Sequence, residues 1–144
     1  MNVLLLFSLS ISLLISSISD PKKYKVSIRI EGIRNGNGNV LLSAYHNEDE
    51  FDDETPFQRW TIEKTGLEDS VVNFEIELIE GTYGLALLDD ENKNREMDYS
   101  WLMMPEEGFA FSDFYLEGLS KPDFEDFDFP LKGDRQTVMK IRYF

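Results

Sequence analysis

Cysteine is absent from the 144-residue sequence, and histidine occurs once, at His46. Without cysteine the chain can form no disulfide, so its own hydrophobic core must hold the fold together. A zinc site built from cysteine and histidine is excluded as well, because a single histidine cannot complete the coordination shell. The Gly-x-Ser-x-Gly motif of serine hydrolases is also missing. These absences argue against thiol, zinc and serine–histidine chemistry.

Positive charge is scarce in the sequence. Lys and Arg number 14 against 28 Asp and Glu, and the formal net charge is −14. No basic stripe offsets this field, which repels nucleic acid and anionic lipid surfaces. We therefore expect no nucleic-acid partner, and cations or cationic surfaces are the natural electrostatic partners. The alternative is that the acidity only keeps an exported domain soluble.

Charged side chains are also missing before Asp20, where residues 3–18 are all apolar or Ser. This stretch is shorter than the roughly 20 apolar residues of a membrane helix, and its length is typical of a signal-peptide core. Ser17 and Ser19 supply the small side chains that signal peptidase recognises. We expect a signal peptide over residues 1–19 and a mature single domain over residues 20–144. The protein would be secreted or periplasmic, with no transmembrane segment after leader removal.

Helical periodicity does not extend beyond a turn or two, whereas period-two alternation recurs along the chain. It predicts strands over residues 24–31, 38–46, 56–64, 71–78, 83–88, 124–131 and 137–143, with residues 109–111 as an edge strand or a packed loop. Asn-Gly occurs twice within residues 35–38, which predicts a hairpin between the first two strands. Residues 47–55 are polar and predict a loop with one helical turn.

Short strands at this spacing are typical of an all-β sandwich. We predict an antiparallel β-sandwich of immunoglobulin-like or transthyretin-like type with about seven strands, and a closed barrel is the alternative. Leu41 and Tyr45 fall on the nominal outer face of their strand, so that strand should be central or covered. The shared inward phase predicts a core of Val26, Ile28, Ile30, Leu42, Phe74, Ile76, Leu85, Leu87, Met139 and Ile141.

The run from Asp89 to Asp98 carries oxygen-bearing side chains without apolar periodicity, which predicts a loop. Its spacing matches positions 1, 3, 5, 7 and 9 of a calcium-binding loop, where position 7 supplies a backbone carbonyl: Asp90, Asn92, Asn94, Glu96 and Asp98. Position 6, usually Gly, is Arg95, and position 12, usually Glu, is Trp101. Additional ligands would come from Asp89, Glu106 or Glu107. The alternative is a metal-free loop closed by Asx turns.

Aromatic residues are frequent around this loop. They predict either a sugar-stacking or peptide-binding platform or a set of core and loop-anchoring side chains: Trp60, Tyr99, Trp101, Phe109, Phe111, Phe114 and Tyr115. Carboxylate pairs for glycoside hydrolysis carry no information here, because 28 acidic residues make many pairs.

Several segments, in this order, resemble the secreted bacterial family known as domain of unknown function 2141: residues 31–35, 38–40, 81–83, 90–98, 105–112 and 122–126. The resemblance covers nearly the whole predicted mature chain. It implies a single exported β-sandwich domain without an established activity. The chain departs from the family pattern at Arg95, where the family usually has Gly, and at Asp89, where it often has His. The first departure weakens a tight calcium turn, and the second adds a carboxylate.

Together these observations predict an exported, non-enzymatic binding or structural module of the bacterial cell envelope, with calcium as its one candidate cofactor. Envelope glycan or protein would be its partner. Two rival functions remain at this point. One is a hydrolase of envelope polysaccharide that uses carboxylates near Asp98 and Glu106, which would require a raised pKa inside a cleft. The other is the aromatic sugar- or peptide-binding platform.

Overall fold

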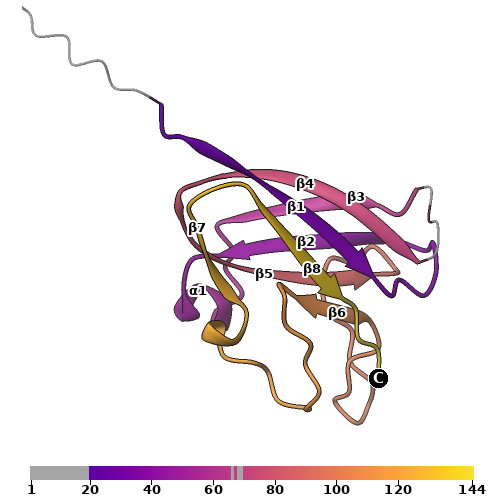
Figure 1. The fold of residues 1–144 in the computed structure, drawn as a ribbon. Coiled ribbons are helices and arrows are strands. Elements are labelled where there is room, and N and C mark those ends of the chain that lie inside the picture. The colour runs from indigo at the N-terminus through magenta and orange to yellow at the C-terminus, as the bar shows by residue number, and fades with distance from the viewer. Residues whose placement is uncertain (1–19, 66, 68–69) are drawn as a thin grey trace, which may run out of the picture.

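Two stacked β-sheets form the body of the protein in a computed structural model that describes residues 20–65, 67 and 70–144 (Figure 1). The predicted signal peptide, residues 1–19, lies outside the described residues. The first sheet has three strands in the order β4 (Val71–Ile79), β1 (Lys23–Glu31) and β8 (Arg135–Lys140). β1 pairs with β4 in antiparallel and with β8 in parallel orientation, so one pair departs from the antiparallel prediction.

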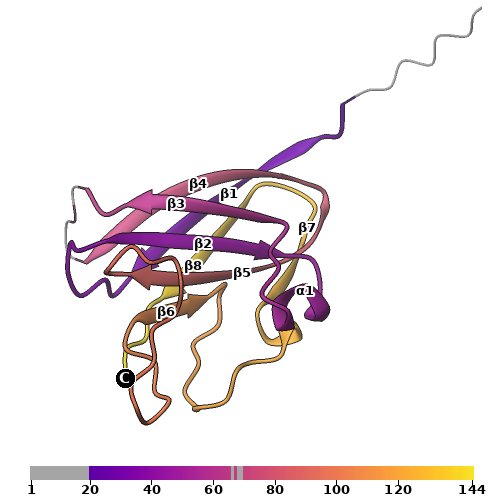
Figure 2. The ribbon, with the colours of Figure 1, turned by 180° about the vertical axis from the view of Figure 1, so that it is seen from behind.

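The second sheet has five strands and carries the acidic loop. β3 (Gln58–Glu63), β2 (Asn39–Tyr45) and β5 (Gly81–Asp90) lie side by side (Figure 2). The other edge of β5 is shared by two short strands. β7 (Asp128–Leu131) pairs with its first half and β6 (Gly108–Phe111) with its second half. The predicted β-sandwich is therefore confirmed, with eight strands in the described part of the chain. β2 is central, as its apolar outer face predicted.

The predicted hairpin between the first two strands is wrong. β1 and β2 belong to different sheets, and the segment between them crosses from one layer to the other. Gly32 and Gly38 adopt φ of +83° and +71° there, in the left-handed region that favours glycine. A Cβ atom at Gly38 would overlap the carbonyl oxygen of Asp90. These glycines thus serve a close approach between two segments and not a hairpin turn.

Further boundaries differ from the prediction. Asp89 and Asp90, expected in the loop, are the last two residues of β5. The predicted strand over residues 124–131 begins with a 3-10 turn, Phe124–Asp126, and only its second part pairs as β7. The last strand ends at Lys140, and Ile141 to Phe144 continue without strand pairing beyond an isolated bridge. The helical turn expected within residues 47–55 is present as α1 (Glu48–Asp52), and Asn47 caps it by accepting the N–H of Glu50 at 2.9 Å.

The main hydrophobic core lies between the two sheets. Every residue of the predicted core is buried there except Phe74, which is half-buried and packs against it. A second, smaller cluster lies on the outer face of the five-stranded sheet, where α1 and the 3-10 turn cover it: Tyr45, Phe51, Phe111, Phe124 and Phe127. The acidic loop therefore leaves the sandwich at the end of β5, between two strands that are fixed by packing on both faces.

Candidate functional site: the β5–β6 loop and its base

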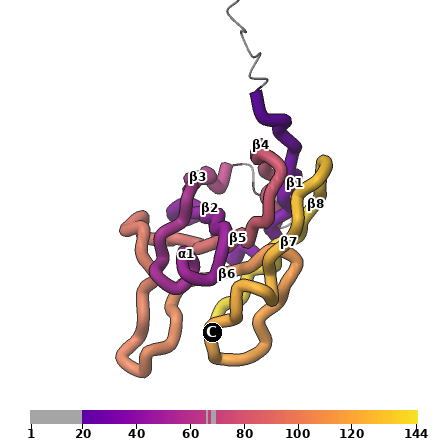
Figure 3. The backbone as a smooth tube through the Cα atoms, turned by 90° about the vertical axis from the view of Figure 1, so that its left-hand side faces the viewer, coloured from indigo at the N-terminus to yellow at the C-terminus, as the bar shows by residue number. Residues whose placement is uncertain are grey.

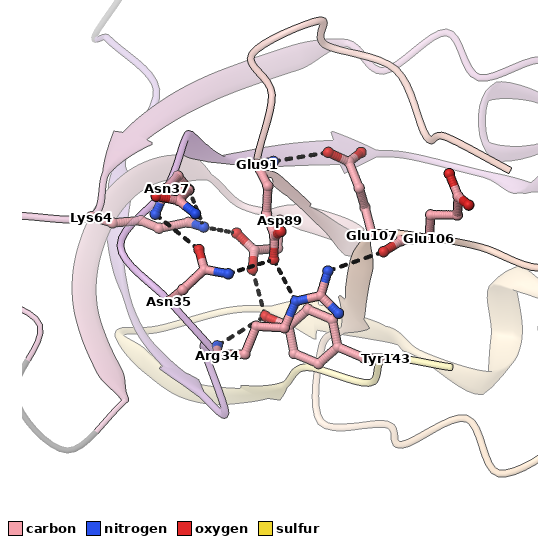
Figure 4. A network of polar contacts seen from close by, with 9 residues as sticks. All are labelled: Arg34, Asn35, Asn37, Lys64, Asp89, Glu91, Glu106, Glu107 and Tyr143. Atoms are coloured by element: carbon pink, nitrogen blue, oxygen red, sulfur yellow. Dashed lines mark hydrogen bonds and ion pairs between the residues drawn. The ribbon is translucent and has the colours of Figure 1, made fainter. Parts of the chain in front are cut away.

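Asp89, the penultimate residue of β5, points into a buried polar network (Figure 4). Its side chain is 0% exposed and forms an ion pair with Lys64, whose side chain is 1% exposed. Tyr143 donates its hydroxyl to the second carboxylate oxygen at 2.5 Å. Burial raises the pKa of the Tyr143 phenol, and the hydrogen bond to Asp89 raises it further. The fold itself therefore supplies a cation and a hydroxyl donor to Asp89.

Both ends of the loop are held by the segment between β1 and β2. Arg34 donates Nε to Glu91 at 2.6 Å and Nη2 to the carbonyl oxygen of Glu106 at 3.1 Å. Asn35 adds a hydrogen bond to the same Glu91 oxygen at 3.1 Å. The hydrogen bond from Arg34 lowers the pKa of Glu91, and that of Arg34 is raised in turn. One short segment thus holds Glu91, the first residue after β5, close to Glu106, two residues before β6.

Asp90 faces the loop and not the network. Its side chain is buried, and its two oxygens accept the backbone N–H groups of Asn94 at 3.1 Å and Arg95 at 3.0 Å. Asn92 accepts the N–H of Asn94 at 2.9 Å, and Asn94 accepts that of Glu96 at 2.9 Å. These are Asx turns, the alternative by which the sequence could close the loop. The loop is closed by its own backbone N–H groups.

Asp98 joins the same group of side chains from the far side of the loop. Asn92 donates its amide to Asp98 at 2.5 Å, and Asn94 donates to both Asp98 oxygens at 3.1 Å. Four of the five predicted calcium-loop positions therefore meet through hydrogen bonds. The fifth, Glu96, takes part through its backbone N–H, which Asn94 accepts, and not through the carbonyl that its position in the pattern would supply.

Arg95 occupies the position where the family pattern has glycine, and it adopts φ of +70°. A left-handed conformation costs a non-glycine residue about 1 kcal/mol or more. The tight turn is formed nevertheless, because the carboxylate of Asp90 accepts the N–H of Arg95. Arg95 therefore adopts the left-handed conformation that glycine would adopt without this cost.

Glu107 brings a third carboxylate to the loop from the start of β6. It is 4% exposed, and its Oε1 accepts the N–H of Glu91 at 2.8 Å. Its Oε2 is buried without a hydrogen-bond partner among the described residues. Burial raises the pKa of Glu107, and the nearby carboxylates of Asp90 and Asp98 raise it further. A buried, partly unpartnered carboxylate thus lies beside two others.

The two other suggested ligands have different surroundings. Asp89 is engaged by Lys64 and Tyr143, and the side chain of Glu106 is exposed and points away from the network in Figure 4. No group of three or more His, Cys, Asp or Glu side chains in the part of the chain that the structure describes is arranged to hold a metal ion. A cation at the loop would therefore need amide and carbonyl oxygens in addition to carboxylates.

The aromatic residues do not form one platform. Tyr99, Phe109 and Phe111 line a groove on the outer face of the five-stranded sheet. The other four have separate places: Trp60 packs against the main core, Phe114 packs against the second cluster, Tyr115 lies under Lys140, and Trp101 is 89% exposed. Three of the seven residues of the predicted platform thus line the groove.

Sequence reasoning missed Arg34, Lys64 and Tyr143, which surround the base of the loop. Lys64 and Tyr143 both lie at the ends of predicted strands, and nothing in the local pattern indicates that either side chain takes part in a site. The glycines around Arg34 were the available signal, because they allow a close backbone approach as well as a hairpin.

None of the described residues belongs to a helix long and apolar enough to cross a membrane. No curated protein and no solved structure matches the sequence significantly. The sequence profile of one protein family does match, over residues 28–139, a range that extends from β1 to β8 and includes the whole acidic loop. The chain therefore belongs to the DUF2141 family, described as uncharacterized protein conserved in bacteria.

Proposed function

We propose that the chain is an exported, non-enzymatic binding or structural module of the bacterial envelope whose acidic loop is organised by calcium. The observation that carries this proposal is the buried carboxylate of Glu107, which has one unpartnered oxygen and a pKa that burial raises and the charges of Asp90 and Asp98 raise further. None of the three forms an ion pair among the described residues. A divalent cation would relieve their repulsion while it gained ligands.

The ligand set fits a calcium ion better than a smaller one. Asp90, Asp98 and Glu107 would supply carboxylate oxygens, the amides of Asn92 and Asn94 would turn their oxygens inward, and Glu96 would supply its carbonyl. Calcium accepts six to eight oxygens in flexible geometry, whereas magnesium requires an octahedron and releases water reluctantly. Because Asx turns and amide hydrogen bonds must rearrange, we expect a weak site with Kd on the order of 1 mM, as in extracellular modules.

Export and a role in the envelope rest on the charge-free residues 3–18, which have the length of a signal-peptide core. The rival hydrolase needs a carboxylate that has a raised pKa and is accessible to substrate. Glu107 has the raised pKa, but it is 4% exposed and does not line the groove. The geometry therefore favours a binding or structural role over hydrolysis.

Thermal unfolding with and without calcium tests the proposal. At about 10 mM calcium, a Kd of about 1 mM gives roughly 1.4 kcal/mol of stabilisation, which raises the melting temperature of a domain of this size by about 3–6 °C. Magnesium at the same concentration should raise it less. Asp98→Asn should abolish the calcium shift, and Glu77→Gln, an exposed change on β4, should leave it intact.

Charge screening is the outcome that would contradict calcium binding. In that case calcium and magnesium would shift the melting temperature equally, and Asp98→Asn would respond like the wild type. Isothermal titration calorimetry separates the two explanations, because a loop site saturates at one calcium ion per chain and screening does not saturate stoichiometrically.

A further inference from the structure

An open groove of about 700 Å³ runs across the outer face of the five-stranded sheet. Its floor consists of outward-facing apolar side chains of the central strands and β6: Leu41, Tyr45, Leu88, Phe109 and Phe111. Outward positions of a two-layer sandwich normally face water and are polar. The main core lies on the other face of this sheet. Tyr45 and Phe111 belong to the second cluster under α1 and the 3-10 turn, but Leu41 and Leu88 belong to neither cluster, so packing within the fold does not account for the whole floor.

Two loops form the walls of the groove. The connections from β5 to β6 and from β6 to β7 both project from the same end of the molecule (Figure 3). Each brings an exposed apolar side chain to the groove: Met103, which is 75% exposed, and Leu119, which is 74% exposed. Covering these apolar side chains with a ligand would lower the free energy, because their surface would be removed from water. The walls as well as the floor therefore suit an apolar ligand.

The charge of the groove differs from that of the whole chain. Three basic and two acidic side chains line it, although the net charge of the sequence is −14. Arg59, on β3, donates Nε to Ser43 at 3.0 Å, and neither Arg59 nor Arg95 forms an ion pair in residues 20–65, 67 and 70–144. Lys121 is already bound to Asp52 at 2.9 Å. Two guanidinium groups thus remain available to an anionic ligand group.

We propose that this groove binds a small amphiphile with an apolar body and an anionic head group. The body would lie on Leu88 and the aromatic floor, and the head would reach the guanidinium of Arg59. The volume is within the range of about 300–1,000 Å³ that small-molecule sites occupy. A sugar fits less well, because the floor is mostly apolar and would leave most of its hydroxyl groups without hydrogen-bond partners. This site is separate from the proposed calcium loop and does not depend on it.

Calorimetric titration with two twelve-carbon amphiphiles below their micellar concentrations tests the proposal. Dodecanoate carries an anionic head and dodecyltrimethylammonium a cationic one, so their apolar bodies are matched. A chelator should be present, because calcium precipitates dodecanoate. We expect one dodecanoate per chain, bound at least tenfold more tightly than the cationic compound. This preference is opposite to the one that a net charge of −14 would impose on unspecific binding.

Variants at exposed positions locate the binding without disturbing the fold. Arg59→Gln should weaken dodecanoate about tenfold or more, since charge-assisted hydrogen bonds to carboxylates are strong, and should leave the cationic compound unchanged. Leu119→Asp should weaken both compounds. Arg29→Gln, on the exposed face of β1 in the other sheet, is the matched control and should change neither.

Three results would overturn the proposal. The first is equal or tighter binding of the cationic amphiphile, and the second is an unchanged dodecanoate affinity in Arg59→Gln. The third concerns a second copy of the chain as the occupant. Sedimentation would then show a dimer that Met103→Asp dissociates, and the groove would be an interface between copies.

Discussion

Asp89 and Asp90 are neighbours in the chain and are both buried, at 0% and 1% exposed. Their surroundings nevertheless differ in charge, because a lysine pairs with Asp89 and a further carboxylate lies near Asp90. Asp89 has Lys64 and the hydroxyl of Tyr143 as partners. Asp90 has only backbone N–H groups, and the nearby side chain that responds to its charge is another carboxylate, Glu107. The inner acid is neutralised by the fold, whereas the outer acids have no cationic side chain as a partner among the described residues.

Strand geometry is the origin of this difference. Successive side chains of a strand point to opposite faces, so Asp89 and Asp90 must leave β5 in opposite directions. The inner direction meets Lys64 after β3 and the C-terminal segment, and the outer direction meets only the loop itself. The inner network thus fixes the position of the loop, whereas the side chains of Asp90 and Asp98 are bound only by groups of the loop itself.

The largest effect should come from breaking the inner pair. Lys64→Met removes the ammonium and leaves the charge of Asp89 buried, which should cost about 3–5 kcal/mol of stability. Denaturant unfolding measures the loss, and calcium should not restore it because the loop ligands are elsewhere. Lys25→Met, in an exposed pair with Glu75, should cost less than about 1 kcal/mol. Equal losses in the two variants would show that Asp89 is not buried as described.

Removing a charge from the outer carboxylates should change the stability in the opposite direction. Glu107→Gln removes a buried charge beside Asp90 and Asp98 and should stabilise the calcium-free protein at neutral pH by about 1 kcal/mol. The same change should abolish the melting shift that calcium produces. Thermal unfolding with chelator and with calcium measures both effects. A destabilised variant that still responds to calcium would contradict the role of Glu107 in the loop.

A smaller effect should come from the backbone of the loop. Arg95→Gly relieves the left-handed conformation at φ of +70° and should raise stability by about 0.5–1 kcal/mol, because greater freedom in the unfolded chain offsets part of the gain. Glu96→Gly is the matched control, since Glu96 does not adopt a positive φ. Glu96→Gly should lower the stability by a similar amount. A loss in both variants would mean that Arg95 stabilises the turn through its side chain.

The sequence predicted the sandwich and most of its core because alternation of apolar residues reports directly which face of a strand is buried. Val26, Ile28 and Ile30 show this clearly, and all three are buried. The two Asn-Gly pairs gave a wrong prediction because the left-handed conformation, which Gly38 adopts and Gly36 does not, serves a crossing between sheets as well as a hairpin. Strand pairing depends on partners far along the chain, which local patterns do not identify.

For the site, the spacing from Asp90 to Asp98 predicted side chains that do meet, because alternate residues of a tight loop point inward. Lys64 could not be predicted, since nothing local distinguishes a lysine that will be buried from one that will be solvated. The difference between Asp89 and Asp90 depends on such distant partners, and therefore only the structure shows it.

The smallest effect should come from Glu91, whose side chain is 20% exposed and whose partner Arg34 is 42% exposed. The hydrogen bond from Arg34 lowers the pKa of Glu91. The stability it contributes is therefore present above the unfolded pKa of about 4.3 and is lost as the pH falls through the lowered folded value. Glu91→Gln should cost about 0.5 kcal/mol at pH 7, after allowance for solvent screening, and progressively less as the pH falls through the lowered folded pKa. Burial raises the pKa of Glu107, so the gain from Glu107→Gln should likewise be present at pH 7 and vanish in acid. Denaturant unfolding of both variants at pH 7 and in acid measures these effects. The two changes in stability should have opposite signs at pH 7 and should both approach zero in acid. Changes of equal sign at pH 7 would contradict the contrast between Glu91, which Arg34 binds, and Glu107, which has no cationic partner among the described residues.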